Sequence, residues 1–176
     1  MYKGCILSLS CNKYYYNFIV KILSQGDNMQ ITSRFTIAVH LITCIDHFSD
    51  RERVNSEFLA GSTGVNPVMV RQVISMLRKA GIVETTRGSS GARLAKPLSE
   101  VTFYDIYEAV DSAEAKDGLF HFHENPNPDC PVGKNIHNIL DEQLLSIQNA
   151  MEAQMRQITL ADIAKKARTE ILKDAE

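Results

Sequence analysis

Hydrophobic residues recur along the first half of the chain with the spacing of amphipathic helices. From Phe35 to Phe48 the apolar positions fall every three or four residues, which predicts a helix. After a polar turn, a second and shorter helix is predicted over residues 56–62. Asn55 or Ser56 can cap its start, and Gly64 makes the turn that follows it.

The next segment, GVNPVMVRQVISMLRKAG, is the most informative in the chain. Asn66 is a favourable N-cap, Pro67 suits the first helical position, and Gly81 suits the position beyond the helix end. One face of this helix is apolar, and the opposite face carries cations and amides. Two helices joined by a glycine-bearing turn, the second with a cationic outer face, are the pattern of a helix-turn-helix.

A β-hairpin is predicted directly after this helix. Residues 82–86 and 92–95 are typical of two short strands, and residues 87–91 form the tip between them. The glycines of the tip permit a positive φ, and the tip has no acidic group that would repel phosphate. A helix-turn-helix followed by a hairpin with a basic tip is a winged helix.

The second half of the chain is predicted to consist of helices around one loop. A capped amphipathic helix starts at Thr102, and beyond the loop apolar residues recur every three or four positions over about six turns. A long helix must bury such a stripe, and we expect a second copy of the chain to cover it. Folding back on its own domain is the alternative. The residues assigned to this dimer interface are Ile136, Leu140, Leu144, Ile147, Met151 and Met155.

Together these patterns predict a mainly α fold with a small β-hairpin (α+β). A winged helix-turn-helix domain is followed by a long C-terminal dimerisation helix. The chain divides into an N-terminal extension (1–28), the winged domain (29–97), a connecting helix (98–117), a loop (118–135), the dimerisation helix (136–158) and a short helix with a polar tail (159–176).

The N-terminal extension, residues 1–28, differs in sequence character from the rest of the chain. Its apolar stretch is too short for a signal peptide. The residues before Met29, Gln25-Gly26-Asp27-Asn28, are what a codon run containing a ribosome-binding sequence would encode. We therefore expect translation to start at Met29, with a disordered or loosely helical extension as the alternative.

Composition adds a segregation of charge. The net charge is −2, yet residues 29–97 hold nine Lys and Arg against five Asp and Glu, and residues 98–176 hold seven against fifteen. A basic half joined to an acidic half indicates that one half contacts an anion. No apolar run is long enough to predict a membrane span.

Cysteine usage and motif content bear on compartment and class. The four cysteines lie at no repeating interval, which favours a reducing cytoplasm over a disulfide framework. No nucleophile elbow, P-loop or H-E-x-x-H motif is present, so we do not expect an enzyme.

Contacts to DNA are assigned to the helix after Asn66 and to the wing. The first turns of the helix are expected to reach base edges, where a good bidentate contact contributes ~1–3 kcal/mol of discrimination. The candidate DNA-binding residues are Ser33, Arg34, Asn66, Val68, Met69, Arg71, Gln72, Ser75, Arg78, Lys79, Arg87, Ser89, Ser90 and Arg93. Of these, Lys79, Arg87, Arg93, Ser33 and Arg34 are expected to contact phosphates. A merely solvated face is the alternative for each cation, and a winged helix that binds protein instead of DNA is the alternative for the domain.

Three segments carry a family resemblance: MQITSRFTIAVHLI, VNPVMVRQVISMLRKAGIVETTRGSSGARLAKP and ITLADI. They resemble the Rrf-two (Rrf2) family of bacterial transcription regulators from Met29 to about Lys165. The family's wing signature has two adjacent glycines, and here Ala92 stands in place of the second. The resemblance implies a homodimer that binds double-stranded DNA at a partly palindromic operator, usually as a repressor, in response to a signal that the residues do not identify.

The loop HFHENPNPDCPVGKNIH has three interpretations. Family members with iron–sulfur clusters use three cysteines here, whereas this chain has only Cys130, so a cluster is disfavoured and no cofactor is expected. Cys130 ahead of a helix is a possible thiol-redox sensor, because helix amides lower a thiol pKa. His121, His123, Cys130 and His137 are weak candidate zinc ligands. The third interpretation is a stiff structural loop.

Overall fold

The computed structural model describes residues 32–86, 91–111, 120 and 125–173. Within these residues, the winged domain is built around its first helix, α2 (Ser33–Phe48). Leu41, Ile42 and Ile45 of α2 have no exposed surface. They lie three or four residues apart, so one face of α2 enters the core. This face packs against α3, α4, α5, α7 and β2.

The helix-turn-helix and the wing follow in the predicted order. Helix α3 spans Ser56–Thr63, α4 spans Pro67–Lys79, and the antiparallel strands β1 (Val83–Thr86) and β2 (Gly91–Leu94) form the hairpin. Asn55 caps α3, and Gly64 ends it at a φ of +68°. The predicted fold class, mainly α with one small hairpin, is confirmed.

Helix α5 (Phe103–Val110) follows the 3-10 turn η1 (Leu98–Glu100) and joins the domain to the C-terminal helices. The Phe103 N–H donates to the Ile158 carbonyl at 2.9 Å, and the Leu160 N–H donates to the Val101 carbonyl at 2.8 Å. These two bonds hold the junction of α6 (Pro131–Gln157) and α7 (Leu160–Lys173) against the start of α5.

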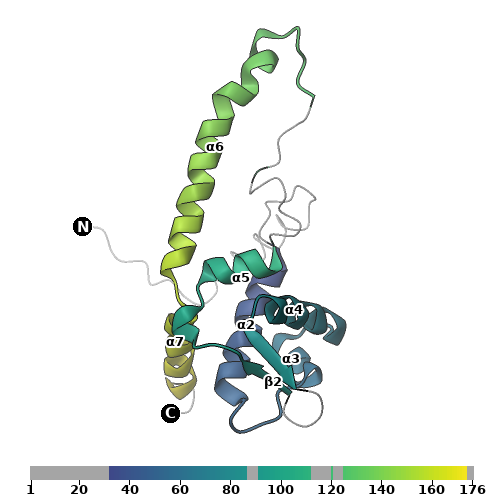
Figure 1. Cartoon of the computed structure of the whole chain (residues 1–176), viewed down its shortest axis with the longest axis vertical. Helices are drawn as coiled ribbons and strands as arrows, with labels where there is room; N and C mark the ends of the chain where they lie inside the picture. Colours follow the sequence, from purple (N-terminus) through teal and green to yellow (C-terminus); the bar gives the residue numbers. More distant parts are fainter. Residues whose placement is uncertain (1–31, 87–90, 112–119, 121–124, 174–176) are drawn as a thin grey trace, which may run out of the picture.

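Helix α6 stands away from the winged domain along most of its length (Figure 1). It begins at Pro131, so Cys130 directly precedes a helix as the sequence predicts, and the loop assigned to residues 118–135 ends five residues earlier. Pro131 and Gly133 look like loop residues, but Pro131 takes the first helical position. A Cβ on Gly133 would lie 2.6 Å from the Asn127 carbonyl oxygen, because the preceding loop crosses it closely.

Helix α7 is longer than the short helix and polar tail that the sequence predicts, since it continues to Lys173. Leu160 and Ala164 are buried, and Arg168 forms an ion pair with Asp46 of α2 at 2.6 Å. Exposed Lys, Arg and Glu residues are good helix formers, so a polar segment continues as helix once its first turns are packed. The N-terminal extension lies outside the described residues. None of the helices described has the length and apolar content to cross a membrane.

Candidate nucleic-acid interface

Helix α4 presents a polar face to solvent because its apolar face is buried. Val70, Val73, Ile74 and Leu77 are at most 8% exposed, and they fix the rotation of the helix. The opposite face consists of exposed Val68, Arg71, Gln72, Arg78 and Lys79, with half-buried Met69 and Ser75 beside them. All the α4 residues predicted to contact DNA are therefore at least partly accessible.

Asn66 has a structural role at the start of this face. Its side-chain oxygen accepts a hydrogen bond from the Val68 N–H at 2.7 Å, which caps α4. The side-chain NH₂ group stays on the exposed surface as a donor. Asn66 thus positions the first turn of α4, and its side-chain NH₂ group is a donor that can face DNA.

Arg71 has a partner that the sequence analysis missed. Its guanidinium forms an ion pair with Glu57 of α3 at 3.0 Å, and both side chains are exposed. Hydrogen bonding by the backbone at Glu57, and then by the Arg71 side chain, lowers the pKa of Glu57. The pair directs the guanidinium from α4 toward α3, and it places a carboxylate within the cationic surface.

The base of the wing is tightly constrained. Arg93 is exposed on β2 and lies opposite Glu84 of β1. Gly91 has a φ of +74°, and the Ala92 N–H donates to the Val54 carbonyl at 2.8 Å. Ala92 is buried without a positive φ, so alanine fits where the family pattern has its second glycine. Arg87, Ser89 and Ser90 lie outside the described residues.

The N-terminal candidates differ in accessibility. Ser33 is exposed in the first turn of α2, whereas Arg34 is half-buried. Thr32 caps this turn by accepting from the Arg34 N–H at 3.2 Å, and its hydroxyl also donates to Asp111. The α2 N-terminus is therefore tied to the end of α5, and Ser33 is the more accessible of the two.

The predicted interface stripe on α6 is only partly exposed. Leu140 and Ile147 are exposed, and Ile136, Leu144 and Met151 are half-buried. Met155 is 9% exposed, because the end of α6 packs on α5 of the same chain. Ile139 and Leu145, which the sequence analysis did not assign to the stripe, are more than half exposed.

Cys130 is the N-cap residue of α6 and is half-buried. The backbone N–H groups of Gly133 and then Val132 lower the pKa of its thiol. Cys44, by contrast, belongs to the buried core of the winged domain.

The weak zinc candidates are not brought together by what the structure describes. His137 lies 3.4 Å from Asp141 within α6, while His121 and His123 lie outside the described residues. In the described ranges, no three His, Cys, Asp or Glu side chains are grouped so that they could hold a metal ion.

The order α2, α3, α4, β1 and β2, with a polar and cationic outer face on α4, defines a winged helix-turn-helix protein. The model of the Rrf2 family, described as an iron-dependent transcriptional regulator, matches residues 31–166. The chain belongs to the Rrf2 family, which confirms the resemblance seen in the sequence.

Individual relatives agree with this assignment. The Bacillus subtilis (strain 168) protein YwnA, named as a candidate HTH-type transcriptional regulator, is 43% identical over 133 residues, which are 76% of this chain and 96% of YwnA. A solved candidate transcriptional regulator from Lactobacillus plantarum is 27% identical, with a TM-score of 0.62 over 81% of this chain and 98% of that chain. The global cysteine regulator CymR of B. subtilis, 20% identical, shares the fold, with a TM-score of 0.56 over 77% of this chain and 95% of CymR.

Proposed function

We propose that this protein is a sequence-specific DNA-binding transcription regulator that acts as a homodimeric repressor. The observation that carries the proposal is the outer face of α4, where exposed Arg71, Gln72, Arg78 and Lys79 stand on a helix fixed by its buried face. Such a helix fits the major groove, where Arg and amide side chains read base edges. Regulation, and not catalysis, is the activity we assign.

The two kinds of DNA contact divide along α4. Gln72 lies in the first half of the helix, where a recognition helix meets base edges. Lys79 ends the helix, and Arg93 extends from the wing, so both are placed to neutralise phosphates. We therefore assign sequence discrimination to Arg71 and Gln72, and assign affinity without discrimination to Lys79 and Arg93.

A homodimer would explain the exposed apolar side chains of α6. Leu140 and Ile147 are exposed on a helix that stands away from its own domain, and apolar surface of this kind is usually covered by a partner. A twofold dimer would place two copies of α4 on one face of DNA. Its operator would then be partly palindromic, with half-sites about one helical turn apart or a multiple of it. Because DNA is the partner, we place the protein in the cytoplasm.

An iron–sulfur cluster does not fit the chemistry of the residues present. Cluster ligation typically takes several thiolates, and the chain offers only Cys130 between α5 and α6. We propose that the protein works without a cluster. For Cys130, both a thiol switch and a structural role stay open, and the close packing of Asn127 on Gly133 supports the structural one.

The test is a DNA titration by fluorescence anisotropy, with the region upstream of the protein's own gene and a scrambled duplex as probes. Gln72→Ala should weaken binding to the operator by about 5- to 100-fold and leave the scrambled duplex unaffected. Lys79→Ala should weaken both and reduce the salt slope by about one. Lys166→Ala, which removes an exposed cation from α7, is the control.

The alternative function is a winged-helix adaptor that binds protein. It would be supported if Arg71→Ala, Gln72→Ala and Arg93→Ala combined left DNA affinity unchanged. Selection from a randomised duplex pool covers the case in which the operator lies elsewhere in the genome.

A further inference from the structure

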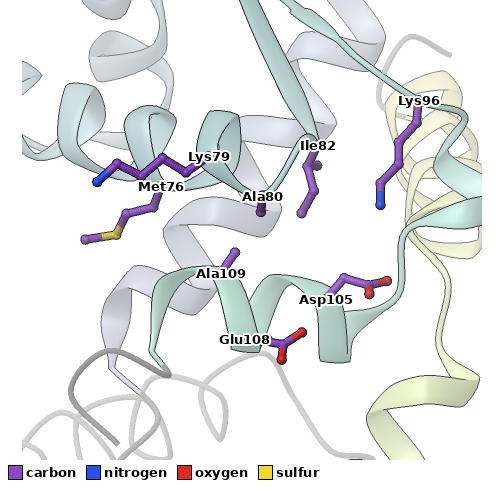
Figure 2. Close-up of a pocket in the computed structure, with 8 residues that line it drawn as sticks. All are labelled: Met76, Lys79, Ala80, Ile82, Lys96, Asp105, Glu108 and Ala109. Atoms are coloured by element: carbon purple, nitrogen blue, oxygen red, sulfur yellow. The ribbon is translucent and has the colours of Figure 1, made fainter.

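A hollow of about 480 Å³ lies between the end of α4 and helix α5. Its apolar lining comes from both sides: Met76, Ala80 and Ile82 on the side of α4, and Ala109 on α5 (Figure 2). Ala80 and Ala109 face each other, and their small side chains leave the space open. The volume falls within the range of small-molecule sites, about 300–1,000 Å³.

Charges of both signs surround this apolar lining. Lys79 and Lys96 supply the cations, and Asp105 and Glu108 supply the carboxylates. Figure 2 shows Lys96 and Asp105 pointing toward one another from opposite sides of the hollow. Within the part of the chain that the structure describes, neither lysine forms an ion pair, so the opposite charges face each other without closing the space.

Asp105 has one oxygen available toward the hollow. The Thr102 N–H and the Thr102 hydroxyl both donate to Oδ2 of Asp105, each at 2.7 Å. Because these bonds hold the carboxylate through one oxygen, its orientation is fixed and Oδ1 can accept a further donor. The Asp105 side chain is thus a preorganised acceptor and not a freely moving surface acid.

The arrangement of charges limits the chemistry of a ligand. A simple anion would be attracted by Lys96 and repelled by Asp105, and a simple cation would meet the reverse. A molecule with a carboxylate, an ammonium and an apolar group satisfies both signs and the lining together. From this we infer that the hollow binds a small zwitterion of the amino-acid type, its carboxylate on Lys96, its ammonium on Asp105, and its side chain against Met76, Ile82 and Ala109.

The position of the hollow gives such a ligand an effect on DNA binding, an effect that rests on the proposed function. One side of the hollow is formed by α4, the helix that presents Gln72 and Arg78. The other side is formed by α5, whose start is hydrogen-bonded to the end of α6. A ligand held by both helices favours the α4–α5 arrangement that fits it best. The ligand can shift DNA affinity only by as much as it distinguishes the two arrangements.

The experiment is calorimetric titration of the full chain with L-leucine, L-valine, L-methionine and L-phenylalanine. N-acetyl-L-leucine lacks the ammonium, and 3-methylbutylamine lacks the carboxylate, so each removes one half of the proposed recognition. At least one amino acid should bind, and N-acetyl-L-leucine and 3-methylbutylamine should each bind at least tenfold more weakly than that amino acid. If none of the four binds, or if either analogue binds as well as the tightest amino acid, the inference is overturned.

Two variants test the location. Lys96→Met removes the carboxylate partner, and Ala109→Leu fills the space; neither residue belongs to the proposed DNA surface. Both should abolish amino-acid binding while circular dichroism and ligand-free DNA affinity stay unchanged, and Lys166→Met should behave as wild type. If Ala109→Leu instead weakens self-association, the hollow is a subunit contact and the inference fails.

The ligand site and the proposed function can fail separately. Amino-acid binding without any DNA binding would leave the site standing and refute the regulator. DNA binding that no amino acid alters, although one binds, would refute the effector role. DNA binding with no amino-acid binding would refute the site alone.

Discussion

The exchange of Gly91 for alanine tests how the wing is attached to the domain. Gly91 has a φ of +74°, and a left-handed conformation costs a residue with a Cβ about 1–2 kcal/mol. The new Cβ would also lie 2.4 Å from the carbonyl oxygen of Val54, which is fully buried and accepts the Ala92 N–H at 2.8 Å. Relieving that contact stretches the buried hydrogen bond from the Ala92 N–H to the Val54 carbonyl. Leaving a buried partner of such a bond unsatisfied costs about 1–3 kcal/mol.

The two costs together lower the free energy of unfolding by about 2–5 kcal/mol, which for a chain of this size corresponds to about 4–20 °C in Tm. Urea denaturation followed by circular dichroism at one fixed protein concentration measures the change. Gly61→Ala is the matched control, because Gly61 lies within α3 with nothing within 4 Å of its Cβ. It should gain up to about 1 kcal/mol. A Gly91→Ala protein within about 0.5 kcal/mol of wild type would refute the reasoning.

Three further predictions concern single side chains. Glu57→Gln removes a carboxylate from the cationic surface and releases Arg71 from its ion pair. Affinity for the scrambled duplex should rise about two- to fivefold, while the ratio of operator affinity to scrambled-duplex affinity should fall. An unchanged ratio would contradict the role of Glu57 in directing Arg71. The backbone N–H groups of Gly133 and Val132 lower the pKa of the Cys130 thiol. Its alkylation by iodoacetamide, followed by mass spectrometry of the Cys130 peptide, should therefore reach half-maximal rate at a lower pH in the folded than in the urea-unfolded protein. Equal midpoints would argue against the lowered pKa. Ile147→Asp places a charge on the exposed apolar stripe of α6 and should yield monomers in sedimentation analysis. Asn149→Asp, which changes another exposed residue of α6, is the control and should remain dimeric. A dimeric Ile147→Asp protein would place the interface elsewhere.

Local signals in the sequence were sufficient for the elements of the winged domain. Asn66, Pro67 and Gly81 each act within one turn of the helix end that they define, so their roles follow from neighbouring residues alone. The buried stripe of α4 follows from helical spacing in the same way. The surface position of the polar face of α4 follows from that spacing without any tertiary contact.

Features that depend on distant residues could not be read in this way. The ion pair of Arg71 with Glu57 joins two helices, and the close approach of Gly91 to Val54 joins the wing to the segment before α3. Lys96 and Asp105 face each other across the hollow because α5 packs on α4. Gly133 lies in the first turn of α6, where the backbone of Asn127 leaves no room for a Cβ, and neighbouring residues do not reveal that contact.

Helix α5 contacts both the recognition helix α4 and the end of α6. On one side it packs against α4, and on the other Tyr104 lies under the guanidinium of Arg156 in α6, 3.5 Å from the ring centroid. Cys130 lies at the far end of the 27 residues of α6, about 40 Å from this junction. Along the described helix α6, oxidation of Cys130 would reach α4 through a change in the tilt of the whole helix. A ligand in the hollow touches α4 and α5 directly. By distance alone, the hollow is therefore the more direct of the two places from which DNA affinity can be altered within one subunit.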